Sequence, residues 1–316
     1  MELRQLRYFV AIADHGSLSK AAERVYVAQS ALSHQMAQLE SELGARLFDR
    51  SRRGVELTEA GQRFFPHAVA ILRQTEEAVA SVRSTDQEPE GHVVFGIPHS
   101  ASHALALPLL RAVRQRHPKV TLELTEELTG NLTRQLRTGQ IQLAVLFDDG
   151  QLSGFTSTRV LREQLHLIEP DQAHGPGRRV LSLKQALAHP LVLPASPHGV
   201  RPIIEGAAAA AGLPPPRVEA DISSISILRT TLLAGLGRTL LPVMPLQPEL
   251  QAGLLRATPV QGLHRVLAVC SSAHIPRSSA CHAVASLAVA LMAELSNRGL
   301  WAGSAVMGDQ EVHTPR

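Results

Sequence analysis

Residues 17–44 read SLSKAAERVYVAQSALSHQMAQLESELG, and this stretch decides the fold of the N-terminal part. Ser17 is of a residue type that caps helix N-termini. The apolar residues that follow it recur at helical spacing: Leu18, Ala21, Ala22 and Val25. A second helix buries a similar set and stops at a glycine: Leu32, Met36, Leu39 and Leu43. Two short helices with a tight turn and a small-residue contact are typical of a helix-turn-helix, whose second helix enters the major groove of DNA.

The second helix turns small and polar side chains away from its apolar face. The residues we expect at a DNA interface on this helix are Gln29, Ser30, Ser33, His34 and Ala37. The first two begin the helix, where they either cap it or contact phosphates and base edges. Ser33 and His34 are expected to read base edges or phosphates, and Ala37 to allow close approach or touch a thymine methyl. A merely solvated face is the alternative.

The flanks complete a winged DNA-binding domain. Leu3, Leu6 and Val10 predict a first helix that ends at Gly16, and the residues from Arg46 to Leu57 predict a small hairpin. Residues 1–60 hold eight basic and eight acidic residues, so charge alone would not indicate DNA. The hairpin instead gathers the arginines expected to bind phosphate or enter a minor groove: Arg50, Arg52 and Arg53. Surface ion pairs are the alternative role for some of them.

A long helix is predicted from a cap at Thr58 to about Ser84, with Pro66 expected to kink it. Its apolar side alternates steps of four and three residues: Phe64, Ala68, Ile71, Thr75, Ala78 and Val82. Such a heptad seam indicates either dimerisation or a helix buried against its own chain.

Short apolar runs alternate with helical stretches after residue 92, which predicts an α/β fold with a mainly parallel sheet in two lobes. The expected strands are 93–97, 120–124, 141–147, 191–193, 239–241 and 266–270. The expected domains are a winged helix-turn-helix at 1–58, a linker or dimerisation helix at 59–88, an effector-binding domain at 92–296 and a flexible tail at 297–316. Within the effector-binding domain we expect lobe I at 92–162 and 265–296 and lobe II at 163–264.

Polar residues follow two of these strands where a ligand would bind. Pro98, Ser100 and Ser102 lie at the junction of one strand with a helix, and Thr129 lies in the same position after the next strand. Ligands of open α/β sheets gather beyond strand carboxyl ends, and helix N-termini attract anions. The sequence thus predicts a cleft for a carboxylate or another anion, with helix capping as the alternative role for each hydroxyl.

Composition and motifs exclude several other classes. The chain has 316 residues, 44% hydrophobic and 19% charged, with a formal charge of +3, as expected for an ordinary globular protein of two or three units. No export signal or membrane span is expected, and two cysteines favour a reducing compartment, so we expect a cytoplasmic location. His99 and His103 lack a third metal ligand. No catalytic constellation is found, and we expect no enzyme, metal or cofactor.

The run from Gln29 to Gln35, followed by Leu39-Glu40, Leu47-Phe48 and the run from Leu57 to Gly61, resembles the signature of LysR-type transcriptional regulators. Ala144 to Asp148 and Pro108 to Leu110 resemble the nitrogen assimilation control branch. The chain departs from the pattern at Ser30, where proline is common, and at His34, where arginine or glutamine is common, which leaves the base preference open.

The resemblance implies an N-terminal winged helix-turn-helix, a linker helix and a two-lobed α/β domain like that of periplasmic binding proteins. It places these residues around an effector cleft: Pro98, Ser100, Ser102, Thr129, Phe147, Ser196, Ile222 and Ser226. The implied partners are double-stranded DNA, a small-molecule effector such as an anion, a second copy in a homodimer or homotetramer, and RNA polymerase, with no membrane. An effector-free regulator controlled by its own abundance is the alternative, and a solute-binding protein is opposed by the N-terminal motif.

Overall fold

The computed structural model describes residues 1–51, 54–83, 88–148, 150, 152–171, 180–195 and 199–308. The chain divides into two compact units, Met1–Asp86 with Thr138–Gln140, and Gln87–Arg137 with Ile141–Arg316. Each unit has its own hydrophobic core, and each is described by itself.

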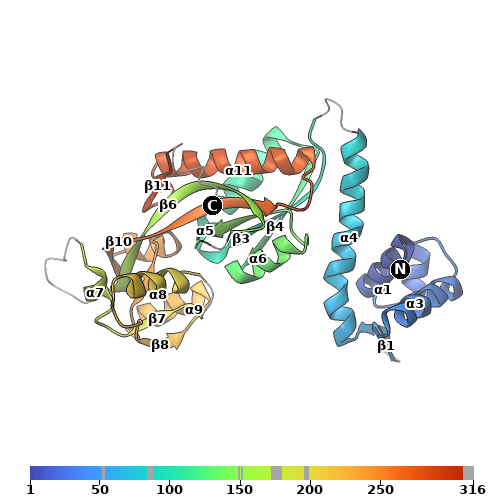
Figure 1. Cartoon of the computed structure of the whole chain (residues 1–316), viewed down its shortest axis with the longest axis horizontal. Helices are drawn as coiled ribbons and strands as arrows, with labels where there is room; N and C mark the ends of the chain where they lie inside the picture. Colours follow the sequence, from blue (N-terminus) through green and yellow to red (C-terminus); the bar gives the residue numbers. More distant parts are fainter. Residues whose placement is uncertain are drawn as a thin grey trace. The chain divides into compact units, whose positions relative to one another are not determined.

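The first unit is a helical domain with a two-stranded wing (Figure 1). Its elements are α1 (Leu3–His15), α2 (Leu18–Arg24), α3 (Gln29–Leu43), β1 (Phe48–Ser51), β2 (Gly54–Leu57) and α4 (Glu59–Arg83). The ring of Phe9 is fully buried at the centre, with centroids 5.2 Å from those of Phe48 and Phe64. Ser17 accepts the backbone N–H of Lys20, so the predicted cap of α2 is confirmed.

Hydrogen bonds of Thr58 connect the start of the wing to the start of α4. Thr58 Oγ1 accepts the backbone N–H of Gly61 at 3.0 Å and donates to the carbonyl of Arg46 at 2.7 Å, which confirms the predicted cap of the long helix. A Cβ on Gly61 would overlap the carbonyl oxygen of Leu47, so only glycine allows this close approach. The strands β1 and β2 pair antiparallel, as a hairpin requires.

The helix α4 continues through Pro66 as one helix. Ala68 is buried in the core of the first unit, and Phe64 and Ile71 pack against that core. The first half of the heptad seam is therefore buried against its own chain, which is the alternative to dimerisation. Val79 is exposed by 49%, the side chain of Val82 lies outside the description, and dimerisation through the second half stays a prediction.

Lobe I of the second unit is a sheet covered on both faces. It contains β3 (Gly91–Pro98), α5 (His99–Arg116), β4 (Val120–Glu127), α6 (Thr129–Arg137), β5 (Leu143–Phe147) and α11 (Ser279–Asn297). Alternate residues of β3 point to opposite faces. Val93, Phe95 and Ile97 pack beneath α5 and α11, whereas Val94 packs with Leu132 and Leu136 of α6.

Two long strands, β6 (Phe155–Pro170) and β10 (Leu255–Ser272), run antiparallel from lobe I into lobe II (Figure 1). Lobe II holds α7 (Leu183–Ala186), β7 (Leu191–Leu193), α8 (Arg201–Ala210), β8 (Val218–Asp221), α9 (Ile225–Leu233), β9 (Thr239–Leu241), the 3-10 helix η1 (Met244–Leu246) and α10 (Gln247–Gln251). Along β6, Leu161 lies in the lobe I core and Leu165 in the lobe II core. Along β10, the change falls between Leu263 and Leu267.

The strand predictions were incomplete, and the expected mainly parallel sheet was wrong. The sheet has the order β11-β6-β10-β5-β3-β4, with β9 beside β6. Among the described strand pairs of this sheet, only those of β3 with β4 and with β5 are parallel. The strand β6 was missed because its first residues after Phe155 are polar: Thr156, Ser157, Thr158 and Arg159. The predicted strand 266–270 is the middle of the 18-residue strand β10.

The prediction of a flexible tail at 297–316 is wrong for the first half of that segment. Trp301 is 1% exposed, and Ser304–Val306 forms the strand β11 on β6. Ser304 Oγ also lies 2.8 Å from Ser296 Oγ of α11. The Gly, Ser and Met residues around Trp301 resemble a tail in composition, but one large apolar side chain and a strand pairing fix the segment. Residues 309–316 lie outside the description.

Of the helices in the described part of the chain, α11 is the one whose length and composition would suffice to cross a membrane. Core helices of globular proteins meet the same criteria, and α11 has eight buried residues in lobe I: Ala280, Cys281, Val284, Ala285, Leu287, Ala288, Met292 and Leu295. Its apolar character is thus accounted for by packing on the sheet.

Candidate functional sites

The outer face of α3 carries the predicted DNA-contacting residues on the first unit. Gln29, Ser30, His34 and Ala37 are exposed, and Ser33 is half-buried. The apolar side of the same helix is held in the core by Leu32, Met36 and Leu39. Within the described residues no side chain caps the N-terminus of α3, and its first turn holds no acidic residue. The free backbone N–H groups and the helix dipole therefore suit an anion at this end.

The turn between α2 and α3 contains Tyr26, which the sequence reasoning did not single out. Among the described residues other than glycine, Tyr26 is the one with a positive φ, at +56°. Its side chain is 89% exposed. A left-handed backbone costs a tyrosine about 1–2 kcal/mol, and strain of this kind gathers at functional sites. We therefore expect the exposed hydroxyl of Tyr26, in the turn before α3, to contact a phosphate of bound DNA.

Substitution of Tyr26 by glycine is expected to stabilise the first unit by about 0.5–1 kcal/mol, because glycine relieves the strain but loses more chain entropy on folding. Denaturant unfolding measures this change. The same variant should bind DNA a few-fold more weakly, which a gel-shift titration measures. Tyr26→Asn is the matched control, since asparagine tolerates this φ but lacks the aromatic hydroxyl. A destabilised glycine variant would show that the turn is not strained.

The wing arginines are only partly described. Arg50 lies on β1, where its backbone pairs with Val55, and nothing is described of its side chain. Arg52 and Arg53 lie outside the described residues, so their phosphate contacts stay a prediction. The structure adds two exposed basic residues on α2, Lys20 and Arg24.

The second unit has a hollow between its lobes with about 380 Å³ of empty space, including its open mouth. Lobe I contributes the ends of β3, β4 and β5 and the starts of α5 and α6, as expected for strand carboxyl ends. The lining residues of lobe I are Pro98, His99, Ser100, Glu127, Leu128, Thr129, Phe147 and Arg265. Those of lobe II are Pro194, Gly199, Val200, Ser223, Ile225 and Leu241.

The predicted cleft residues divide into two groups. Pro98, Ser100, Thr129 and Phe147 line the hollow together. Ser102 does not line it. Its hydroxyl lies 2.5 Å from Glu126 and 3.0 Å from the carbonyl oxygen of His99. Ser102 follows Ser100 by two residues in α5, and this step along a helix points the two side chains in nearly opposite directions.

In lobe II the hollow is lined by sequence neighbours of the predicted residues and not by those residues themselves. Ser223 and Ile225 line the hollow, whereas Ile222 packs against the lobe II core and Ser226 is exposed on α9. Ile222 also bonds by its backbone N–H to Leu193, which directs its side chain into the core. Ser196 lies outside the described residues.

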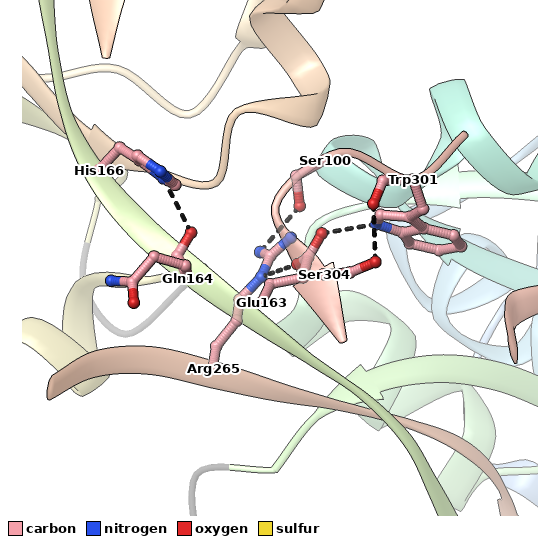
Figure 2. A network of polar contacts seen from close by, with 7 residues as sticks. All are labelled: Ser100, Glu163, Gln164, His166, Arg265, Trp301 and Ser304. Atoms are coloured by element: carbon pink, nitrogen blue, oxygen red, sulfur yellow. Dashed lines mark hydrogen bonds and ion pairs between the residues drawn. The ribbon is translucent and has the colours of Figure 1, made fainter. Parts of the chain in front are cut away.

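Arg265, one of the lining residues, belongs to a buried ion pair with Glu163. Figure 2 shows this pair and the polar contacts around it. Arg265 and Glu163 are 2% and 0% exposed, and Arg265 Nε donates to Glu163 Oε2 at 2.5 Å. Arg265 Nη1 donates to Ser100 Oγ at 2.9 Å, and Cζ lies 4.0 Å from the ring centroid of Phe147. Trp301 Nε1 donates to Glu163 Oε1 at 2.7 Å. Both oxygens of Glu163 thus accept from N–H groups, as an ionised carboxylate does.

Burial lowers the pKa of Arg265, and the charge of Glu163 opposes that shift. An arginine keeps its charge despite such a shift, because its ordinary pKa lies far above neutrality. Nearby, His166 Nδ1 lies 3.1 Å from the carbonyl of Gln164, and burial lowers the pKa of His166 (Figure 2). Arg265 is therefore a charged residue in the lining of the hollow, paired with Glu163.

Two family models match the chain. The LysR substrate binding domain matches residues 86–293, and the helix-turn-helix model of bacterial regulatory proteins of the lysR family matches residues 3–62. The chain belongs to the LysR family. Both parts of this LysR-type transcriptional regulator, the DNA-binding domain and the effector-binding domain, are therefore as the sequence signature indicated.

Relatives place this LysR-type regulator near the nitrogen assimilation control branch, as predicted. The nitrogen assimilation regulatory protein nac of Klebsiella aerogenes is 38% identical over 243 residues, covering 77% of this chain and 78% of the relative. The protein of that name from Escherichia coli (strain K12) is 36% identical with the same coverage.

Solved structures show the same fold for the whole LysR-type chain. Full-length OxyR from Pseudomonas aeruginosa, in a variant form, has a TM-score of 0.68 at 20% identity and covers 100% of this chain and 99% of its own. Full-length CbnR in complex with its target DNA has a TM-score of 0.63 at 24% identity, with 93% and 100% covered. The N-terminal domain, linker helix and two-lobed domain are thus the architecture of a full-length regulator.

The cysteines of this LysR-type regulator are predicted to be unreactive. Burial, together with the charge of Asp148, raises the pKa of Cys270 to about 12, against a smaller opposing effect of a backbone hydrogen bond. The reactive thiolate is therefore disfavoured at neutral pH. We expect no alkylation of Cys270 by iodoacetamide in the folded protein and rapid alkylation in urea. Rapid alkylation with native circular dichroism would contradict this.

Sequence reasoning missed Arg265 and Glu163. Both interrupt or border apolar stretches of long strands, and a charged residue at such a position indicates a buried partner. Arg265 directly precedes the apolar run 266–270, which was the available signal. The partner could not be found in the same way, because Glu163 lies 102 residues away along the chain.

Proposed function

We propose that this LysR-type regulator binds double-stranded DNA through the exposed face of α3 and that a small molecule in the hollow between the lobes modulates it. The observation that supports the DNA part best is the outer face of α3, where exposed Gln29, Ser30, His34 and Ala37 stand over a buried apolar side. These residue types contact base edges and phosphates in major grooves.

The hollow supports the effector part. It lies beyond the carboxyl ends of β3, β4 and β5 and between two lobes that are joined by β6 and β10. A ligand that binds one arrangement of the lobes better than another shifts the population toward it. The effector-free alternative is less favoured, because Arg265 in the lining of the hollow keeps one buried nitrogen, Nη2, without a hydrogen-bond partner in the described residues.

The relatives support a proposal for the assembly and the target genes. We propose a homodimer or a dimer of dimers, two half-sites on the DNA, RNA polymerase as a partner and a cytoplasmic location. The CbnR structure contains target DNA, and the nac relatives are named for nitrogen assimilation, which supports promoters of nitrogen metabolism as targets. We further propose that the chain is not an enzyme, since these relatives are regulators.

The DNA part of the proposal is tested by asking whether α3 reads base edges. Duplexes are selected from a random pool by the wild-type protein, and the affinities of the Ser33→Ala and His34→Ala variants for them are measured by titration. Each variant should lose about 1–3 kcal/mol of discrimination at particular base pairs and little affinity for scrambled DNA, because base contacts specify and phosphate contacts position. Equal losses on selected and scrambled duplexes would refute base reading by these two residues.

A further inference from the structure

Arg265 has a nitrogen without a partner in the described residues. Its Nε and Nη1 donate to Glu163 and Ser100, but Nη2 is buried and has no hydrogen-bond partner. The ring of Phe147 stacks near the guanidinium carbon and does not accept N–H groups that lie in the guanidinium plane. A buried charged donor left unsatisfied is costly, so a group that supplies an acceptor here would bind favourably.

Further donors lie close to this nitrogen. Ser100 Oγ accepts from Arg265 Nη1, which leaves the hydroxyl hydrogen free to be donated (Figure 2). The 18-residue helix α5 begins at His99 and the nine-residue helix α6 begins at Thr129, so both present first-turn backbone N–H groups at the lining of the hollow. Three kinds of donor therefore belong to residues in the lining of the same hollow, and each suits a carboxylate oxygen.

The charges around the hollow favour a ligand with one negative charge over a dianion. Arg265 is paired with Glu163, and Glu127 adds a second carboxylate to the lining. A dianion such as phosphate is therefore repelled about twice as strongly as a monocarboxylate, which can still accept hydrogen bonds from Nη2 and from Ser100 Oγ. The remaining surface is apolar, with Pro98, Leu128, Pro194, Val200, Ile225 and Leu241 in the lining.

We propose that the hollow binds a small monocarboxylate with a compact apolar body. One carboxylate oxygen accepts from Arg265 Nη2, the other accepts from Ser100 Oγ, and the apolar body contacts both lobes. This inference rests on the proposed function of the hollow as the effector site and names the chemical class of the effector.

The chain carries its own reporter of this site. Trp301 is the single tryptophan of the sequence, and its indole N–H is bonded to Glu163, the partner of Arg265. The full-length protein is titrated with saturated carboxylates of increasing size, acetate, isobutyrate, pivalate and cyclohexanecarboxylate, with their uncharged amides and with inorganic phosphate. Trp301 fluorescence gives the Kd, and thermal unfolding gives an independent stabilisation.

We expect at least one branched or cyclic carboxylate to bind, with its amide and phosphate at least about tenfold weaker, which is about 1.4 kcal/mol. The double variant Glu163→Gln/Arg265→Gln keeps a neutral pair that can still hydrogen-bond, and it should raise the Kd by at least about tenfold. Arg256→Gln is the matched control, on the same strand β10 but outside this hollow, and should leave the Kd unchanged.

Three results would overturn the proposal. They are equal binding of amide and carboxylate, unchanged carboxylate affinity in the double variant, and the absence of any carboxylate response in both fluorescence and Tm. The first two leave the hollow as an effector site of another chemistry. Failure of the proposed DNA-reading function is seen separately, in the selected-duplex titrations, which need no ligand.

Discussion

The substitution Ala37→Glu is expected to lower the affinity for a preferred duplex at least about 100-fold, because a carboxylate on this face would meet DNA phosphates and base edges, and like charges in contact cost several kcal/mol. Ala37 is exposed on α3, so the fold of the first unit should be kept. Gel-shift titration on a duplex selected from a random pool measures the loss, and circular dichroism checks the fold.

The matched control is Ala209→Glu, the same change at an exposed alanine of helix α8 in the other unit. It adds the same charge to the chain and should change DNA affinity less than about twofold, since exposed charges far from a contact are screened. Equal losses in both variants would mean that net charge, and not the face of α3, governs binding.

The substitution Arg265→Met is expected to destabilise the second unit by about 3–5 kcal/mol, because it leaves the buried carboxylate of Glu163 without its cation. Glu163 is 0% exposed, and its remaining donor is the indole N–H of Trp301. Urea unfolding followed by Trp301 fluorescence reports on this unit, since the chain has one tryptophan.

The double variant Glu163→Gln/Arg265→Met should recover most of that loss, because it removes both charges and keeps an acceptor for Trp301. If the single and double variants unfold at the same urea concentration, the cost would lie in packing of the long side chain and not in the charge of Glu163.

The DNA-binding domain could be predicted from the sequence because its elements are local. Ser17 and Thr58 cap their helices as expected, and the helices end at Gly16 and Gly44. Such signals depend on a few neighbouring residues, and apolar spacing of three and four residues fixes which face is buried. The strain at Tyr26 could not be predicted in this way, because tyrosine gives no signal for a left-handed turn.

The effector-binding domain was less predictable because its decisive contacts are distant in sequence. The strand β6 carries polar residues at its start and is stabilised by pairing with β10, a partner about a hundred residues later in the chain. Trp301 is held by Glu163 across 138 residues. The ion pair of Arg265 with Glu163 could not be predicted for the same reason. The places of Ser100 and Thr129 in the lining could be predicted, because each lies where a strand is followed by a helix.

Sequence recognition is tested most directly by the ratio of affinities for a selected and a scrambled duplex, measured with the wild-type protein at one fixed salt concentration. We expect the selected duplex to be bound at least about 1,000-fold more tightly, as is usual for specific DNA-binding proteins, because α3 reads base edges. Equal affinity for both duplexes would show that this LysR-type regulator does not recognise a DNA sequence.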